Sequence, residues 1–285
     1  MFLFRSAFCD KDGLSSVALA RSRLAKLTGR DGPNHTFWCA LLISTILTNW
    51  YISTMLDKQA VLAAISTVPS WYHQIEVSPG IVTPGINNAK TVLSLMDLPK
   101  DLAGKRVLDI GARDGFFSFE CERRGAEVIA IDYVSGDRTG FNVARDLLGS
   151  QLKLHHDNAY NVTPEKYGTF DIVLLLGLLY HLRDPLFVLD AIRGVCRAAL
   201  YVETAIWPVD SPEPVMRFHP LRDLNDDPSN YWSPNPACLR AMIEEANFVV
   251  NRYSQVNEAR GLVVASVRGD STLEYQAEIS RNLVV

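Results

Sequence analysis

The sequence predicts an α/β protein built on a mostly parallel, seven-stranded sheet that ends in an antiparallel hairpin. From residue 100 onward, short runs rich in Val, Ile and Leu alternate with helical stretches, and this alternation is typical of parallel sheets with right-handed crossovers. The pattern then changes, because the last helical stretch is followed by two apolar runs joined by a short turn. A glycine-containing loop follows the first apolar run, and open α/β sheets bind ligands at this end of their strands.

Five apolar runs are the expected parallel strands. They are rich in branched side chains, as strands buried on both faces are, and they span 106–110, 127–132, 152–156, 170–177 and 199–204. Amphipathic helices are expected between them at 116–124, 140–148 and 185–195. The last of these begins with Asp184 as cap and Pro185 in the first turn, both favourable at a helix start. A helix at 236–248 and strands at 249–256 and 261–267 complete the predicted fold.

Composition and charge limit the classes of function. The chain has 285 residues, of which 48% are hydrophobic, enough for one large domain with an appendage. Neither a disulfide framework nor a metal site is expected, because no CxxC pair or metal-like spacing occurs among Cys9, Cys39, Cys121, Cys196 and Cys238. The first 56 residues hold six of the 28 Lys and Arg residues but only three of the 32 Asp and Glu residues. The rest of the chain is therefore acidic, which disfavours a polyanionic partner.

The N-terminal extension, residues 1–56, differs from the rest of the chain. Residues 37–56 carry no charge, follow a basic stretch and are about long enough to cross a bilayer as a helix. Several Ser, Thr and Asn side chains make this segment less apolar than most membrane spans. Three interpretations stay open: a single membrane anchor, a packed or loosely attached helix, and a non-native extension upstream of a true start at Met55.

The remainder is predicted to form three parts, which we expect to lie in the cytoplasm. Residues 57–99 form a cap or lid, residues 100–270 form the main domain with an insertion at 205–235, and residues 271–285 form a tail. The insertion is too long and polar to be a simple connection.

The loop after the first strand indicates the cofactor. A dinucleotide site has three glycines, and the middle one allows close approach to a pyrophosphate. Here Asp109, Gly111, Ala112 and Gly115 match the pattern, but Arg113 interrupts it. S-adenosylmethionine has no phosphate, and its methionine end requires only that the loop pass nearby. The sequence therefore predicts S-adenosylmethionine as the cofactor.

Acidic residues at the ends of the next two strands support this prediction. Asp132 lies about 20 positions after Gly111, where a carboxylate can accept hydrogen bonds from both ribose hydroxyls. Asp157 can accept from the adenine amino group, while the backbone amide of Asn158 or Ala159 faces the ring. The other expected cofactor-binding residues are Tyr133, Leu176 and Gly177. Each residue alone is also compatible with a turn or a cap, and the prediction rests on their convergence.

The segments "LDIGARDGFFSFECERRGAEVIAID", "GTFDIVLLLGLLYHLRDPLFVLDAI" and "NYWSPNPACLRAMIEEANF", with "WYHQIEVSPGIVTPG" upstream, resemble class I S-adenosylmethionine-dependent methyltransferases. Among these, they are similar to the family of the tRNA wobble-uridine (5-carboxymethoxy/methoxyuridine) methyltransferase. The resemblance implies a Rossmann-like fold and methyl transfer. Tyr180 matches the family's "LYH" tyrosine, which implies a role in holding a carboxylated donor together with a Lys. No equivalent Lys is identifiable, so ordinary S-adenosylmethionine is the expected donor.

Three residues are candidates for catalysis. His181 and His73 are candidate bases, because the unperturbed pKa of an imidazole lies near neutrality. Tyr180 follows the fourth strand, where it can contact both substrates. A structural role for His181, capping or hydrogen bonding within its turn, is favoured over catalysis, since methyl transfer often needs no base. Residues 71–85 are expected to close over the pocket as a lid.

The acceptor is expected to be a small molecule methylated at oxygen, nitrogen or carbon. The predicted substrate-binding residues are Trp71, Tyr72, Glu203, Arg217, Tyr231 and Trp232. Glu203 either orients the acceptor or pairs with Arg217, and the pairing is slightly favoured.

Two other classes of function remain open. A tRNA substrate is disfavoured by the acidic charge, although Arg217, Arg222 and Arg240 could form a local basic patch. A non-catalytic binding module is the second alternative, supported by Arg113 in the glycine loop.

Overall fold

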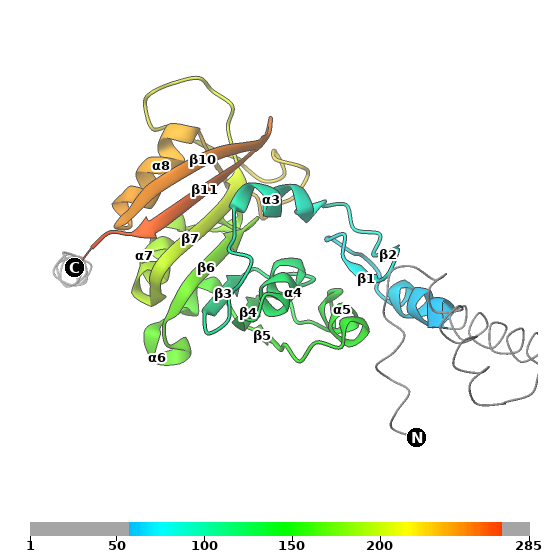
Figure 1. The fold of residues 1–285 in the computed structure, drawn as a ribbon. Coiled ribbons are helices and arrows are strands. Elements are labelled where there is room, and N and C mark those ends of the chain that lie inside the picture. Colours follow the sequence, from blue (N-terminus) through cyan, green and yellow to red (C-terminus); the bar gives the residue numbers. More distant parts are fainter. Residues whose placement is uncertain (1–56, 270–285) are drawn as a thin grey trace, which may run out of the picture. The chain divides into compact units, whose positions relative to one another are not determined.

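The computed structural model describes residues 57–269 (Figure 1). The predicted anchor at 37–56 and the predicted tail at 271–285 lie outside this range. Residues 57–66 are helical, and no helix between residues 57 and 269 is long and apolar enough to cross a membrane. All contacts described below lie within the compact unit that begins at Val61.

A seven-stranded sheet with the strand order β10-β11-β7-β6-β3-β4-β5 forms the centre of the molecule (Figure 1). Its parallel strands are β3 (Arg106–Ile110), β4 (Glu127–Asp132), β5 (Leu154–His156), β6 (Phe170–Leu176) and β7 (Cys196–Ala205). Strands β10 (Phe248–Asn257) and β11 (Arg260–Val267) pair antiparallel with each other, and β11 also pairs antiparallel with β7. The predicted fold class is therefore confirmed.

Three elements differ from the prediction by two residues or more at one end. Strand β5 is shorter, because it lies at the sheet edge and pairs only with residues 130–132 of β4. Strand β7 begins earlier, at Cys196, because it follows the preceding helix without a loop. The helix predicted at 236–248 ends at Glu245, since Asn247 adopts a left-handed conformation with φ of 64° and Phe248 already starts β10.

Helices cover both faces of the sheet. One face packs against α3 (Ala89–Met96), α4 (Phe116–Arg123) and α5 (Phe141–Leu148), and the other against α6 (Pro164–Tyr167), α7 (Pro185–Val195) and α8 (Pro236–Glu245). The predicted start of α7 is confirmed, because the Asp184 side chain accepts a hydrogen bond from the Phe187 amide at 3.2 Å and Pro185 occupies the first turn.

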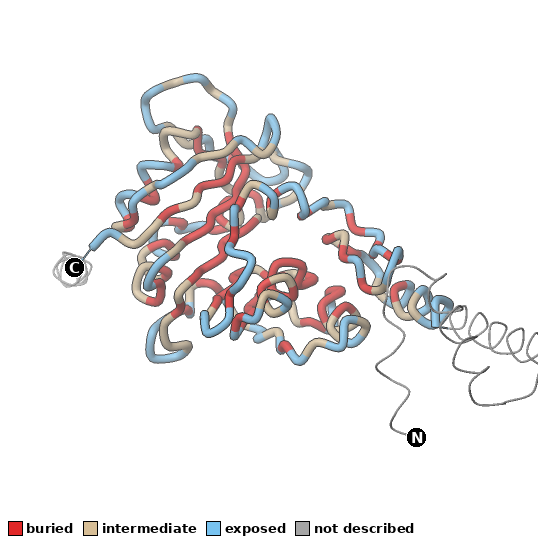
Figure 2. The backbone as a smooth tube through the Cα atoms, viewed as in Figure 1, coloured by how far each residue is buried: buried red, intermediate tan, exposed pale blue. Residues whose placement is uncertain are grey.

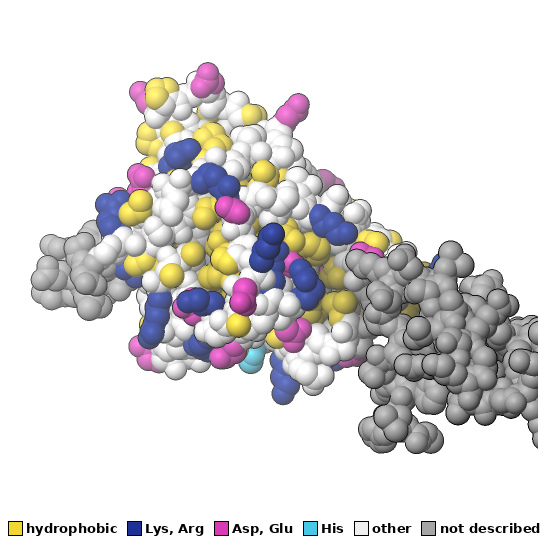
Figure 3. Space-filling view, in the orientation of Figure 1, with side chains coloured by type: hydrophobic (Ala, Val, Ile, Leu, Met, Phe, Trp, Pro, Cys, Tyr) yellow, Lys and Arg dark blue, Asp and Glu magenta, His cyan; other side chains and the backbone are white. Residues whose placement is uncertain are grey.

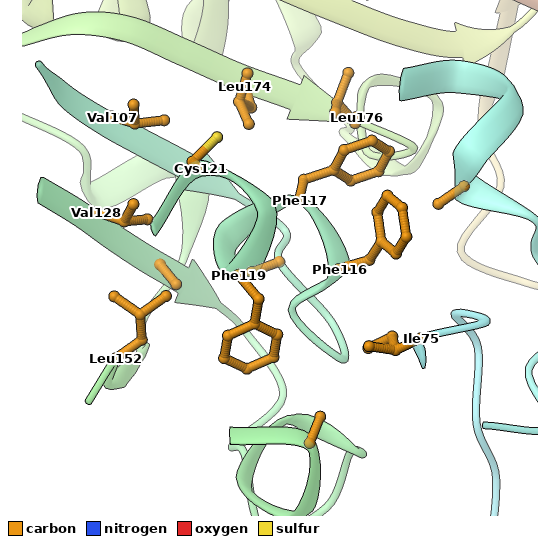
Figure 4. Close-up of a cluster of buried hydrophobic side chains, with 14 of the residues drawn as sticks. Ile75, Val107, Phe116, Phe117, Phe119, Cys121, Val128, Leu152, Leu174 and Leu176 are labelled. Carbon is orange, nitrogen blue, oxygen red and sulfur yellow. The ribbon is translucent and has the colours of Figure 1, made fainter. Parts of the chain in front are cut away.

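Side chains that alternate along the central strands pack into two hydrophobic cores, one on each face of the sheet. Leu174 and Leu176 of β6 point toward α4, whereas Val173 and Leu175 point toward α7. Figure 4 shows Leu174 near Cys121 and Leu176 near Phe117, both on α4. Burial is continuous along the central strands (Figure 2). Since each fully buried Leu or Ile contributes about 1.5–3 kcal/mol, these strands fix the positions of the loops that follow them.

The segment before the sheet belongs to the hydrophobic core on the side of α3, α4 and α5. It contains the short strands β1 (Glu76–Ser78) and β2 (Ile81–Val82), and Ile75, Val77 and Ile81 are buried. Trp71 donates a hydrogen bond from Nε1 to the Ile65 carbonyl at 3.0 Å, and its ring packs so closely on Gly140 that a Cβ there would lie 2.2 Å away. The segment predicted to be a lid is thus packed against the domain.

The insertion after β7 contains a second hairpin. Strands β8 (Met216–Phe218) and β9 (Trp232–Pro234) pair antiparallel, with Phe218 opposite Trp232. Their connecting loop returns toward the sheet, where the Tyr231 amide donates to the Tyr180 carbonyl at 2.9 Å. This contact places the loop beside the carboxyl end of β6.

Candidate functional site

A cavity of about 1070 Å³ opens at the carboxyl ends of the central strands. The sheet supplies the ends of β3, β4 and β6 to its wall, namely Ile110, Gly111, Ile131, Asp132, Leu176 and Gly177. Ligand pockets usually measure roughly 300–1,000 Å³, so this cavity has room for a cofactor and a small acceptor together.

Three amides of the glycine loop are hydrogen-bonded to the end of β4. The amides of Gly111 and Ala112 both donate to the Ile131 carbonyl, at 2.8 and 3.1 Å, and the Arg113 amide donates to Oδ2 of Asp132 at 2.9 Å. Phosphate-binding loops instead leave their amides free for the ligand. These three amides therefore form no phosphate cradle, in agreement with a cofactor that has no phosphate.

Gly111 and Gly115 serve different purposes. Gly111 lines the cavity with φ of 81°, and a Cβ there would lie 3.1 Å from the Leu178 side chain. Gly115 has φ of 90° and faces the core, where a Cβ would lie within 2.5 Å of Phe119 and 2.8 Å of Phe141. The loop thus needs its second glycine for packing of α4 and α5.

Asp132 lies at the cavity wall with its carboxylate fixed by the backbone. Oδ2 accepts from the Arg113 amide, and Oδ1 accepts from the Val134 amide at 2.7 Å. Burial raises the pKa of Asp132 above its ordinary value, against the lowering effect of these hydrogen bonds. Each oxygen retains acceptor capacity for a ligand. The next residue, Tyr133, lines the cavity and is 73% exposed.

Asp157 also lines the cavity, together with Asn158 and Ala159. Its carboxylate accepts hydrogen bonds from Asn161 Nδ2 at 2.8 Å, Lys166 Nζ at 2.6 Å and the Tyr167 hydroxyl. Burial raises its pKa, but these hydrogen bonds outweigh burial and hold the pKa of Asp157 well below its ordinary value. A carboxylate has about four acceptor positions, so three internal partners leave about one for a ligand.

Two predicted cofactor residues lie behind the loop instead of in the cavity wall. Asp109 points toward α4 and accepts from Ser118 Oγ at 2.6 Å, and burial raises the pKa of Asp109 to about 7. Ala112 is buried in the same core. Alternation explains the position of Asp109, because it shares a strand face with the core residue Val107.

The predicted pairing of Glu203 with Arg217 is wrong. Glu203 accepts two hydrogen bonds from Arg260, from Nε and Nη2, each at 2.6 Å. Arg217 lies in the insertion and donates to Asp223 at 3.0 Å. The strands explain the difference, since Arg260 begins β11, which pairs directly with β7. Arg260 lines the cavity, and its guanidinium carbon lies 4.6 Å from the centre of the Tyr180 ring.

Four of the six predicted substrate residues do not line the cavity. Trp71 is held in the core, Trp232 packs on Phe218 with ring centres 5.0 Å apart, and the Glu203 carboxylate is occupied by Arg260. Arg217 is engaged within the insertion. In contrast, Tyr72 and Tyr231 both line the cavity.

All three candidate catalytic residues, Tyr180, His181 and His73, line the cavity. His73 is buried with Nδ1 lacking a hydrogen-bond partner, and burial lowers the pKa of His73 to about 4. Burial also lowers the pKa of His181, although less. The Nδ1 atom of His181 lies 3.1 Å from the carbonyl oxygen and 3.0 Å from Oγ of Ser229.

Sequence reasoning missed two sets of cavity residues. One is the polar stretch of the insertion, which contributes Asn225, Asp227, Ser229 and Asn230. Its density of short polar side chains was a usable signal, since such loops commonly carry function. The other is Arg260, the first residue of β11, where a single charged side chain after a short turn gave no such signal.

Asp114 was also missed, and it fixes the segment before the sheet. This fully buried carboxylate accepts from the amides of Tyr72 and His73 through Oδ2 and from the Gly140 amide through Oδ1. Asp114 of the glycine loop therefore holds Tyr72 and His73, which line the same cavity.

The sheet order, the cavity at the strand ends and the glycine loop define a class I, Rossmann-like methyltransferase architecture. Residues 88–252 match the family described as "Methyltransferase domain", and the chain belongs to this family. S-adenosylmethionine is the methyl donor of these enzymes, so the predicted cofactor is confirmed.

Proteins similar to this chain fall into two groups, one similar in sequence and the other similar in structure. The chain is 29% identical over 163 residues to "tRNA U34 carboxymethyltransferase" of Pseudomonas paraeruginosa, covering 55% of this chain and 49% of that protein. The chain thus spans about half the length of the curated relatives it matches. Among solved structures, the N-terminal domain of EvdMO1, crystallised in the presence of SAH and D-fucose, has a TM-score of 0.57 at 19% identity, covering 75% of this chain and 97% of that domain. A structure of EvdMO1 has a TM-score of 0.52 at 21% identity, covering 74% of this chain and 47% of that one.

Proposed function

We propose that this chain transfers the methyl group of S-adenosylmethionine to a small-molecule acceptor bound in the same cavity. The observation that carries the proposal is the composition of the cavity wall. The strand ends, the glycine loop and the aromatic residues Tyr72, Tyr180 and Tyr231 all line this one cavity. When bound, S-adenosylmethionine supplies an electrophilic methyl group, and the protein contributes mainly by holding donor and acceptor in line.

The residues present fit this cofactor. Asp132 would accept the ribose hydroxyls with the acceptor capacity that its backbone partners leave. Asp157, Asn158 and Ala159 would surround the adenine, and Gly111 would let the methionine end pass close to the loop. The internally bonded amides of the loop support S-adenosylmethionine over a dinucleotide.

Charge supports a small acceptor over a nucleic acid. The charged residues that line the cavity are of both signs: Arg113, Arg183 and Arg260 with Asp132, Asp157, Asp184 and Asp227. On the face shown in Figure 3, Lys and Arg side chains are interspersed with Asp and Glu. A protein that binds tRNA through its phosphates requires a continuous basic surface. The EvdMO1 domain, crystallised with SAH and D-fucose, supports the idea that this architecture accommodates a small acceptor.

Transfer to the wobble uridine of tRNA is the second candidate, and two observations favour it. One is the similarity to "tRNA U34 carboxymethyltransferase". The other is Arg260 beside Tyr180, because this buried cation is a possible partner for a carboxylated donor that the sequence did not reveal. Glu203 already neutralises Arg260, and we therefore retain ordinary S-adenosylmethionine as the donor.

Calorimetry and product analysis test the proposal. We expect S-adenosylhomocysteine to bind the full chain, and label from methyl-labelled S-adenosylmethionine to enter the small-molecule fraction of a cell extract. No binding at millimolar S-adenosylhomocysteine would refute the proposal. Label in the tRNA fraction, or a carboxylated donor retained in native mass spectrometry, would favour the second candidate.

A further inference from the structure

Three residues form a hydrogen-bonded chain at the end of the cavity nearest the insertion. The His181 Nδ1 atom lies 3.1 Å from the Ser229 carbonyl oxygen and 3.0 Å from Ser229 Oγ. The Ser229 hydroxyl donates to Oδ1 of Asp227 at 2.7 Å, and the Ser229 amide donates to the same oxygen at 2.8 Å. The chain therefore runs from an imidazole through a hydroxyl to a carboxylate.

This chain fixes the tautomer of His181. A carbonyl oxygen only accepts hydrogen bonds, so Nδ1 must carry the proton and donate it toward Ser229. In the neutral ring Nε2 is then unprotonated, and it makes no hydrogen bond to any residue between 57 and 269. Since His181 lines the cavity, its basic nitrogen is left for a ligand.

Two residues of the insertion, Asp227 and Asn230, have side-chain acceptor atoms that no residue between 57 and 269 hydrogen-bonds. Asp227 uses only Oδ1 in its hydrogen bonds with Ser229, and the Asn230 Oδ1 atom is buried without a partner. Both residues line the cavity. The unpaired Asn230 oxygen is costly because it is buried, whereas Asp227 is only partly buried, and hydroxyl groups of a ligand would supply donors to both.

We propose that the acceptor is a small molecule with several hydroxyl groups, that one hydroxyl oxygen receives the methyl group, and that His181 Nε2 removes its proton. This inference rests on the proposed function. Ser229 and Asp227 act through His181 as positioning residues, because they hold the ring in one tautomer and stabilise its protonated form.

The chemistry of the transfer explains why a base belongs here. As the acceptor oxygen forms its bond to the methyl carbon, the carbon–sulfur bond breaks and its electron pair goes to sulfur, leaving S-adenosylhomocysteine. The hydroxyl proton passes to Nε2 and is later lost to water. An amine can attack through its lone pair without prior loss of a proton, whereas an alcohol is a poor nucleophile until its proton is removed.

Charged and titratable groups from several elements influence His181. Asp227 of the insertion and Asp132 at the end of β4 stabilise the protonated ring, and Arg260 at the start of β11 opposes it. Tyr180 stacks beside the ring with centres 4.1 Å apart. Removal of the charge of Asp227 should therefore lower the pKa of His181.

The test uses the full chain, [methyl-¹³C]S-adenosylmethionine and a small-molecule cell extract. Carbon NMR of the products identifies the methylated atom, because O-methyl carbons resonate apart from N-methyl and C-methyl carbons. We expect O-methyl signals, and a rate that rises with pH until His181 is deprotonated. His181→Gln should lower the rate by about 10²- to 10⁴-fold and abolish this rise. Asp227→Asn should move the rise in rate to lower pH and reduce the maximal rate at high pH. Ser229→Ala should also reduce this maximal rate.

Exposed His155, which does not line the cavity, provides the matched control, and His155→Gln should leave the pH profile unchanged. Calorimetry with S-adenosylhomocysteine should give similar affinities for all variants, which separates this inference from the proposed function. Methyl transfer to nitrogen or carbon would overturn the inference even when the cofactor binds. A pH profile that persists in His181→Gln, or is unmoved in Asp227→Asn, would overturn it as well.

Discussion

The Oδ2 atom of Asp114 lies 2.7 Å from the backbone nitrogen of Tyr72. This hydrogen bond joins two segments 42 positions apart in the sequence, the glycine loop and the segment that precedes the sheet. The same oxygen accepts from the His73 amide at 2.9 Å. Two cavity-lining residues are thereby held against the loop by one carboxylate.

We expect Asp114→Ala to destabilise the fold by about 3 kcal/mol or more, because three buried amides lose their acceptor and each costs about 1–3 kcal/mol. Chemical denaturation measures this change. Asp114→Asn keeps one acceptor oxygen and should therefore lose less stability than Asp114→Ala. In the parent protein, the Tyr72 and His73 amides should exchange slowly with deuterium even without cofactor. Fast exchange there, reversed by cofactor, would instead support the mobile lid that the sequence predicted.

Asp132→Ala should weaken S-adenosylhomocysteine binding by roughly 1.5–3 kcal/mol, the value of a pair of charge-assisted hydrogen bonds. Calorimetry measures the affinity, and circular dichroism checks the fold. Asp137→Ala offers a matched control, since Asp137 is an exposed carboxylate that does not line the cavity. Equal affinities for both variants would show that Asp132 does not bind the ribose.

Glu203→Gln should destabilise the protein by about 3–5 kcal/mol, because it leaves the mostly buried Arg260 without its counter-charge. The double variant Glu203→Leu/Arg260→Met should recover much of this loss, since no unpaired charge remains. Thermal and denaturant unfolding measure both. A double variant no more stable than Glu203→Gln would mean that the pair itself supplies the stability.

Asp109 should make the stability of the protein depend on pH. Its pKa of about 7 in the fold exceeds the value of about 3.9 in an unfolded chain, so the folded state binds more protons between these values. Stability from this residue is therefore present at low pH and is lost as pH rises toward 7, at about 1.4 kcal/mol per pH unit at most. Comparison with Asp109→Asn isolates the effect, and parallel stability curves for the two proteins would contradict it.

Tyr180→Phe should mainly lower turnover and change S-adenosylhomocysteine affinity little, because the hydroxyl faces Arg260 rather than the glycine loop. Initial rates and calorimetry separate the two effects. A large loss of donor affinity would indicate that the tyrosine holds the donor itself, as the carboxylated-donor alternative requires.

The local signals in the sequence predicted the fold well and the site in part. Strands β3, β4 and β6 are rich in branched apolar residues, and α7 has its own capping residues, so their positions follow from nearby residues alone. Glu203 and Arg260 meet only because β11 pairs with β7, and the sequence offered Arg217 as an equally charged partner. Asp109 was assigned to the cofactor because it precedes the loop, but strand alternation turns it into the core. The sequence thus did not reveal which distant strands pair with each other or toward which face of the sheet a side chain points.

The hydrogen bonds from the glycine loop to β4 also bear on competition inside a cell. The amides of Gly111 and Ala112 are both committed to the Ile131 carbonyl, and the Arg113 amide is committed to Asp132. An abundant nucleotide such as ATP that entered the cavity would place its phosphates beside a loop whose three amides have no hydrogen to offer. Its phosphates would receive no backbone hydrogen bond from these three residues in exchange for water. These three amides thereby disfavour a nucleotide's phosphates, and their contribution should change little with ionic strength because it depends on satisfied hydrogen bonds rather than on charge.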